Sequence, residues 1–277
     1  MRKILFLLPV VLFLAIACRA QELKVMTYNI RFDNPADGVN AWPNRKSKVF
    51  ELLKQYDPDI LGVQEALEHQ IKEIIMAIPE YDFIGVGRDD GKTKGEYSAI
   101  LYKKSKFSVS DPATFWLSET PAVPGSKNWD AAITRVVTWS KFKAKNTETE
   151  FYVLNTHFDH IGKEARKKSA ELIRKRTSEL KGAPVIITGD FNCTRQDEPY
   201  KIMMQKNAIT LIDPAPENAP GTYCTFVVNG PECNPIDYIF HTPQWKSSHY
   251  KIITDNDGKH YPSDHLPVMV TLRLTGK

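Results

Sequence analysis

The stretch PVIITGDFN, residues 184–192, decides how this chain folds. Its first five residues are mostly apolar and β-branched, which is typical of a buried strand, and its last four have the composition of a tight turn. Asp190 and Asn192 alternate in that turn, so both side chains can point the same way. An Asp can activate or orient water while a neighbouring amide holds a phosphoryl oxygen. Taken alone, Gly-Asp also suits an ordinary turn, so the other strands carry the rest of the argument.

Four further apolar runs end in similar polar groups. These groups are Asn29 after 23–28, Gln64-Glu65 after 59–63, Asn155-Thr156-His157 after 151–154, and Ser263-Asp264-His265 before 267–270. Strands that end in metal-binding and acid/base groups can deliver them to one sheet edge, where α/β sites are usually built. The pattern predicts a hydrolytic enzyme that uses a hard cation.

Strands and helices are expected to interleave in one domain from residue 22 to 275. Strands are predicted at 23–30, 59–64, 81–86, 97–103, 106–116, 133–143, 150–157, 184–189, 222–228, 235–240, 249–253 and 267–274, and helices at 43–56, 68–77 and 163–181. The runs from 81 to 157 have only turns between them, which favours antiparallel pairing. So many strands with few helices predict an α/β (α+β) fold in which two packed, mainly antiparallel sheets have helices outside.

The first twenty residues resemble a secretory signal. Arg2 and Lys3 precede an apolar run at 4–17, which is short for a membrane span. Cleavage after Ala20 would release a protein to the periplasm or the extracellular space, whereas the lipobox-like sequence before Cys18 would give a lipoprotein anchored through Cys18. Both outcomes stay open.

The charge balance and the cysteines narrow the class of protein further. Removing residues 1–20 leaves a nearly neutral chain, because the whole chain has only 37 basic against 33 acidic residues. A protein that wraps long nucleic acid is usually strongly basic, so that class is disfavoured. Cys224 and Cys233 flank a predicted hairpin tip and could pair, although spacing alone leaves this open. Cys193 is read as a small apolar filler rather than a nucleophile.

Several side chains are candidates for a metal site and for catalysis. Glu65, at the end of an apolar run, is the best metal-ligand candidate, since Mg²⁺ prefers carboxylate oxygens; a helix cap or salt bridge is its alternative role. Asn29 offers a neutral oxygen. An imidazole held by a carboxylate stays cationic and can stabilise a phosphoryl group, as His265 could with Asp237. His157 could do the same with Glu96.

Arg135, at the head of the run 136–139, suits bidentate phosphate contact; a strand-end charge is its alternative role.

Together these motifs resemble the endonuclease/exonuclease/phosphatase superfamily, with its deoxyribonuclease I-like and nocturnin-like members. The resemblance rests on Thr27-Tyr28-Asn29-Ile30, Gln64-Glu65, Asn155-Thr156-His157, Gly189-Asp190-Phe191-Asn192, Ile236-Asp237-Tyr238 and Ser263-Asp264-His265-Leu266-Pro267-Val268, and it spans residues 23–274. It implies a four-layer sandwich with the site at one end of two central sheets.

The resemblance also implies roles for individual residues. It implies Mg²⁺, or Mn²⁺ as a substitute, on Glu65 with Asn29 and Asp264 nearby. Asp190 would activate water with Asn192 beside it, and Asp237 would hold His265, which faces the scissile phosphate together with His157. Pairing of Glu96 with His157 and phosphate contact by Arg135 are similar to the deoxyribonuclease I-like members. Arg31 stands where exonuclease-III-type enzymes carry an acid, which disfavours metal ligation there.

The sequence therefore predicts an exported Mg²⁺-dependent phosphoester hydrolase of the phosphodiesterase or nuclease type, with in-line attack of water on phosphorus. A phosphomonoesterase acting on a phosphorylated small molecule or sugar is the alternative, and a catalytically inactive cell-surface binding protein is the alternative of another class. The expected partner is an oligonucleotide, a nucleotide, a sugar phosphate or a lipid headgroup. We expect a monomer without an obligate protein partner.

Overall fold

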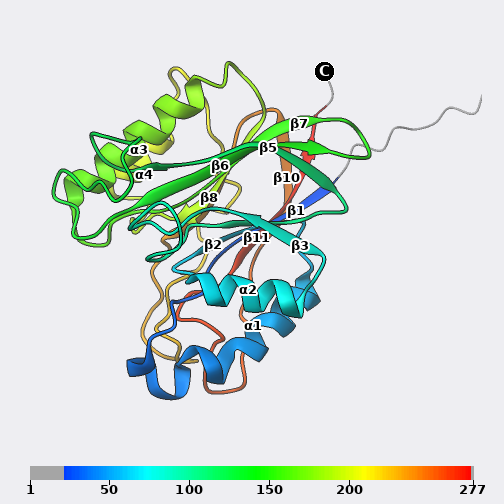
Figure 1. Cartoon of the computed structure of the whole chain (residues 1–277), viewed down its shortest axis with the longest axis vertical. Helices are drawn as coiled ribbons and strands as arrows, with labels where there is room; N and C mark the ends of the chain where they lie inside the picture. Colours follow the sequence, from blue (N-terminus) through cyan, green and yellow to red (C-terminus); the bar gives the residue numbers. More distant parts are fainter. Residues whose placement is uncertain (1–21, 276–277) are drawn as a thin grey trace, which may run out of the picture.

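The computed structural model describes residues 22–275, in which two β-sheets pack face to face between outer helices (Figure 1). The first sheet has the order β10-β11-β1-β2-β4-β3 and the second β5-β6-β7-β8-β9. The first contains β1 (Glu22–Asn29), β2 (Ile60–Gln64), β3 (Tyr81–Ile84), β4 (Ile100–Lys103), β10 (Trp245–Ile252) and β11 (Val268–Leu274). The second contains β5 (Phe107–Trp116), β6 (Val136–Ala144), β7 (Glu150–His157), β8 (Val185–Asp190) and β9 (Asp237–His241). The predicted two-sheet architecture is confirmed.

Helices cover the two outer faces. In Figure 1, α1 (Trp42–Tyr56) and α2 (Glu68–Ala77) lie below the first sheet, and α3 (Lys163–Ser178) and α4 (Glu198–Met203) flank the second. A short 3-10 helix, η1 (Pro35–Asn40), precedes α1. Pro43 stands in the first turn of α1, where its preset φ favours the helix and its missing N–H costs nothing.

Three apolar clusters hold the four layers together. One lies between α1, α2 and the first sheet, and another lies between the second sheet and α3 and α4. The third lies between the sheets and is rich in aromatics, such as Phe142 and Phe151. Burying each such side chain fully contributes roughly 1.5–3 kcal/mol.

Strand register brings the polar strand ends to one edge. β1 pairs with β2, and β7 with β8, in parallel, so that Asn29 lies opposite Gln64 and His157 lies opposite Asp190. Antiparallel pairing of β8 with β9 places Asp190 opposite Asp237. Polar residues that are far apart in sequence therefore lie together at the strand ends, as expected from the strand pattern.

A buried asparagine ties the two sheets together beneath this edge. The Asn155 amide nitrogen donates to the carbonyls of Val63 and Ala99 at 2.8 Å each, and its oxygen accepts from Gln64 at 2.7 Å and Thr188 at 2.9 Å. All four hydrogen-bonding sites of the amide are thus used. A Cβ at Gly62 would lie 2.2 Å from the Thr188 hydroxyl, so glycine is required for this close approach.

Some predicted elements differ from the structure. Residues 222–228 were expected to form a strand but make only isolated bridges. Predicted strand 249–253 belongs to a longer strand, β10, and the helix predicted to reach 181 ends at Ser178. Neither α4 nor η1 was predicted. Cys224 and Cys233 form a disulfide, and Cys193 is a buried free thiol.

Within residues 22–275, no helix is both long and apolar enough to span a membrane. The signal sequence predicted at 1–20 and the lipidation of Cys18 lie outside the described residues.

Candidate active site

The site forms where the central strands end and the backbone turns sharply. Arg31, Glu65 and Asn192 follow β1, β2 and β8, and each has a left-handed φ of 56°, 60° and 45° respectively. Such conformations cost about 1–3 kcal/mol for residues other than glycine and persist only where surrounding contacts enforce them. These three sharp turns, two from the first sheet and one from the second, lie together where the site is built.

Asp190 lies at the centre of the site and is 1% exposed. Its carboxylate accepts hydrogen bonds from the Asn29 amide and from the backbone N–H of Asn192, both at 3.0 Å. Burial, and then repulsion by Asp237, raise the pKa of Asp190 to about 7. A carboxylate with this pKa is suited to accept a proton from water at neutral pH.

Asn29 orients two neighbouring carboxylates. Its side-chain oxygen accepts from the backbone N–H of Arg31 at 3.0 Å, so its NH₂ group must face inward. That group donates to Glu65 and Asp190, both at 3.0 Å. One lone pair of the Asn29 oxygen is taken by this backbone donor and one is left, so the metal ligation predicted for Asn29 stays a prediction.

His265 is held as a cation by two carboxylates. Its Nδ1 lies 2.9 Å from Asp237 and its Nε2 lies 3.7 Å from Asp190. Burial opposes the charge, but the two carboxylates outweigh it and raise the pKa of His265 to about 10. The predicted Asp237–His265 pair is present, and its imidazolium faces the same space as Asp190.

His157 differs from the expectation of a second cation. Its Nε2 lies 3.3 Å from Asp190, yet burial, and then the charges of Arg135 and Arg88, hold its pKa well below the ordinary value. His157 is therefore neutral at physiological pH. The expected pairing with Glu96 is absent, because Arg88 from the same loop binds Glu96 through both oxygens at 2.6 and 2.7 Å.

Arg135 is a buried cation with unused donors. It is 4% exposed, and its Nε and Nη1 have no hydrogen-bond partner among residues 22–275. Its Nη2 lies 3.2 Å from the Nδ1 of His160. Burial, and then Arg88, lower the pKa of Arg135 to about 10, so it stays charged at neutral pH. Buried unpaired donors are costly, so this guanidinium is suited to bind an anion.

The site offers oxygen and nitrogen ligands for a metal ion. Ligand atoms of Asp190, Asp237 and His265 lie within 4.8 Å of one another, which is consistent with a metal site; the two carboxylates can bind a cation directly, whereas His265 could do so only after losing its proton. The Oδ1 of Asp237 is buried and accepts no hydrogen bond from the described residues, so its lone pairs are available. Hard divalent cations prefer such oxygens. The predicted set of Glu65, Asn29 and Asp264 lies beside this group and stays a prediction.

Glu65 and Asp264 share a different cation in this structure. The Arg31 guanidinium lies 3.7 Å from Glu65 and 3.9 Å from Asp264, and Asp37 fixes it at 2.9 Å. Both predicted ligands line the site, and their negative charge attracts a cation. Burial raises the pKa of Asp264 above its ordinary value, and the charges of His265 and Arg31 oppose that shift.

These residues surround one cavity of about 360 Å³. It is lined by Arg31, Phe32, Glu65, Glu96, Ile133, Arg135, His157, His160, Asp190, Asn192, Tyr223, Ile236, Asp264 and His265. Eight of the ten predicted site residues are in this lining; Asn29 and Asp237 contact Asp190 and His265 from behind. The sequence analysis missed Phe32, Ile133, His160 and Tyr223, which lie in loops without a strand-end signal, and Arg88, whose role appears only through Glu96.

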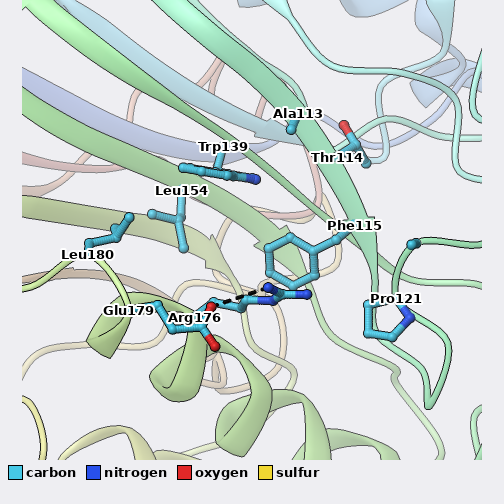
Figure 2. Close-up of a pocket in the computed structure, with 10 residues that line it drawn as sticks. Ala113, Thr114, Phe115, Pro121, Trp139, Leu154, Arg176, Glu179 and Leu180 are labelled. Atoms are coloured by element: carbon cyan, nitrogen blue, oxygen red, sulfur yellow. Dashed lines mark hydrogen bonds and ion pairs between the residues drawn. The ribbon is translucent and has the colours of Figure 1, made fainter.

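A second cavity of similar size lies on the outer face of the second sheet (Figure 2). Trp139 and Phe115 form apolar walls, and the Arg176–Glu179 ion pair at 3.2 Å lies at its edge. It contains none of the groups that converge at the strand ends. The chemistry therefore belongs to the first cavity.

Sequence and structure comparisons agree on the family. The model of the Endonuclease/Exonuclease/phosphatase family matches residues 26–265, so the chain belongs to that family. Together with the buried Asp/Asp/His group, this membership makes the chain a metal-dependent phosphoester hydrolase.

Several solved and curated proteins are similar to this chain. A family protein from Bacteroides thetaiotaomicron superposes with a TM-score of 0.88 at 39% identity, covering 93% of this chain and 100% of that one. The same organism's mannosyl-6-phosphatase superposes with a TM-score of 0.84 at 40% identity, covering 90% and 99%. Nocturnin of Rattus norvegicus is 24% identical over 89% of this chain, which spans only 64% of that protein.

Proposed function

We propose that this protein is a Mg²⁺-dependent phosphomonoesterase that releases phosphate from a phosphorylated sugar. Of the two reactions that the sequence left open, the cavity favours this one over diester cleavage. The buried Arg135 guanidinium carries the proposal, because this residue lines the cavity beside Asp190 and the imidazoles and has two donors without a partner among the described residues. A terminal phosphoryl group brings up to two negative charges and three free oxygens, which suit several convergent donors.

The similarity to the mannosyl-6-phosphatase supports the sugar class. That protein covers nearly the whole of this chain at 40% identity. The chain's near-neutral charge also fits a small substrate better than a long polyanion. Lining residues Phe32, Ile133 and Tyr223 offer apolar surface against which a sugar ring can pack.

The proposed reaction assigns one task to each group. As water attacks phosphorus, Asp190 accepts its proton, the bond to the sugar oxygen breaks, and that oxygen takes a proton from solvent to leave as the sugar hydroxyl. His265 stabilises negative charge on the phosphoryl oxygens. Neutral His157 donates a hydrogen bond, and Arg135 binds two oxygens. A divalent cation bound at the carboxylates would supply Lewis-acid stabilisation of the transition state.

We also propose that the protein is exported. The signal-like sequence at 1–20 supports this, and so does the Cys224–Cys233 disulfide, because disulfides persist in oxidising compartments.

The experiment is a phosphate-release assay on the protein from which residues 1–20 have been removed. Its panel contains hexose 6-phosphates, nucleotides, oligonucleotides and phospholipids, each with Mg²⁺ or with EDTA. We expect the highest kcat/KM on a hexose phosphate and loss of activity in EDTA. Faster cleavage of oligonucleotides or of bis-p-nitrophenyl phosphate than of any monoester would restore the phosphodiesterase alternative.

A further inference from the structure

The segment from residue 221 to 234, here called the strap, crosses the site without joining either sheet. Three of its residues, Thr225, Phe226 and Asn229, have left-handed φ values of 58°, 64° and 58°. Strain of this kind persists only where other contacts enforce the conformation. The strap is closed by the disulfide between Cys224 and Cys233, whose Cα atoms are 4.6 Å apart.

Thr222, on the strap, contacts Asp237, the carboxylate partner of His265. Its hydroxyl lies 2.6 Å from Asp237 Oδ2, the same oxygen that lies 2.9 Å from His265. The hydroxyl also accepts from the backbone N–H groups of Ile236 and Asp237, both at 3.2 Å. Its own proton therefore goes to a nearby acceptor, and the carboxylate is closer than the Asn234 carbonyl at 3.3 Å.

Asp237 depends on this hydroxyl for its orientation. Its other oxygen, Oδ1, has no hydrogen-bond partner among the described residues. Thr222 and His265 are thus the two side chains that hold the Asp237 carboxylate. Loss of the hydroxyl would let the carboxylate turn, and His265 would turn with it.

The strap also pairs with the segment that carries His265. The Cys224 N–H donates to the backbone carbonyl of Asp264 at 2.7 Å, and the Leu266 N–H donates to the backbone carbonyl of Thr222 at 2.6 Å. Between these bonds Tyr223 bridges to His265, and the two rings lie 5.0 Å apart. Tyr223 also lines the cavity, so the strap forms one of its walls.

The two ends of the strap meet at the disulfide. Thr222 and Tyr223 both donate through their N–H groups to the Asn234 carbonyl, at 2.9 and 3.0 Å. A Cβ at Gly221 would lie 1.9 Å from the Cys233 carbonyl oxygen, so the two chains touch there. The Asn234 N–H donates back to the Tyr223 carbonyl at 3.1 Å, so the two ends are joined by hydrogen bonds at Asn234 and by the disulfide at the neighbouring Cys233.

We propose that the Cys224–Cys233 disulfide holds Thr222 and Tyr223 against the Asp237–His265 pair, which makes Thr222 a positioning residue for His265. The rate effects rest on the proposed hydrolytic reaction. The effect on the strap's structure does not.

Two sets of variants test this. Thr222→Val removes the hydroxyl, whereas Thr222→Ser retains it. We expect Thr222→Val to lower kcat about 10-fold or more with KM within about twofold, because partners that orient a catalytic side chain have effects of this size. We expect Thr222→Ser to restore most of kcat. The exposed strap residue Asn229 provides the control, since Asn229→Gly keeps the left-handed turn and should leave both constants unchanged.

The double variant Cys224→Ala/Cys233→Ala should lower kcat by a similar factor and also raise KM, because Tyr223 moves with the strap. Hydrogen exchange gives a second readout. Amides of 221–234 and 263–266 should exchange faster in the double variant, while those of β8 stay protected and confirm folding. Wild-type kcat and KM in folded Thr222→Val and in the double variant, or unchanged exchange in both segments, would overturn the proposal. If the wild-type protein hydrolyses no phosphoester, the proposed function fails, and the exchange result still decides the role of the disulfide.

Discussion

At the scale of single residues, the site places opposite demands on neighbouring groups. Asp190 must be ionised to accept a proton, yet burial raises its pKa to about 7. His265 must stay protonated, and its carboxylate partners raise its pKa to about 10. Groups only a few ångströms apart therefore hold the two protonation states that hydrolysis needs.

These two pKa values predict the pH profile. Because a raised pKa keeps Asp190 protonated, and so inactive as a base, kcat/KM should rise with pH up to about 7. It should fall again as His265 loses its proton near pH 10. A bound cation would move the lower inflection to lower pH without changing the sign of either limb. A profile of the metal-saturated enzyme from pH 4 to 11 measures this, and activity that decreases from pH 5 to 7 would contradict the role of Asp190.

Replacing Arg135 should raise the free energy of unfolding and lower the catalytic activity. Arg135→Met removes a buried charge with two unpaired donors, so we expect the free energy of unfolding to rise by about 1–3 kcal/mol. The same change should lower kcat/KM by about 100-fold or more, as removal of an oxyanion donor does. Thermal melts with and without inorganic phosphate, beside the kinetics, separate the two effects. Phosphate should stabilise the wild type and leave the variant unchanged; equal stabilisation of both would show that Arg135 binds no anion.

At the scale of elements, the site depends on how the two sheets are joined. Each sheet contributes strand ends to the cavity, and Asn155 links β7 to β2 and to Ala99, the residue before β4. This polar contact is fully buried and every hydrogen-bonding group of its amide is paired. It therefore favours one alignment of the sheets over others that apolar packing alone would allow.

Removal of the Asn155 side chain should lower the free energy of unfolding. Asn155→Ala removes four buried hydrogen bonds, to the Val63 and Ala99 carbonyls and from Gln64 and Thr188, so we expect a loss of about 3 kcal/mol or more in the free energy of unfolding. Urea unfolding measures it. The control is Asn146→Ala at an exposed turn between β6 and β7, which should change stability by less than about 0.5 kcal/mol. A similar small change for Asn155→Ala would show that the link contributes little.

At the scale of the whole molecule, the carboxylates at the sheet edge make the fold sensitive to cations. A cation that binds only the folded state adds about 2.7 kcal/mol when its concentration is 100 times its Kd. We therefore expect EDTA to lower Tm and Mg²⁺ or Mn²⁺ to restore it, measured by differential scanning calorimetry. Asp190→Asn should weaken the response, since Asp190 is one of the three clustered residues that could hold the cation. An identical Tm in EDTA and in millimolar Mg²⁺ would show that no cation stabilises this site.

The strand pattern predicted most of the architecture. Apolar runs such as 59–63 and 184–188 form buried strands, because their local composition is enough to predict that they are buried. The prediction of a strand at 222–228 was wrong, because the disulfide and the contacts with 264–266 impose an irregular path there. α4 was missed because six residues are too few for a helical period to show.

The sequence alone determined which residues would stand at the ends of strands, because periodicity and turn chemistry are local. From this pattern we predicted that Asp190, His157 and His265 share one site, and all three line the same cavity. Only the tertiary structure decided which atoms meet there: Arg88 binds Glu96, Asn29 turns its NH₂ group inward, and Thr222 contacts Asp237. These partners come from loops and from strands of two sheets, and their distances depend on packing that no local pattern encodes.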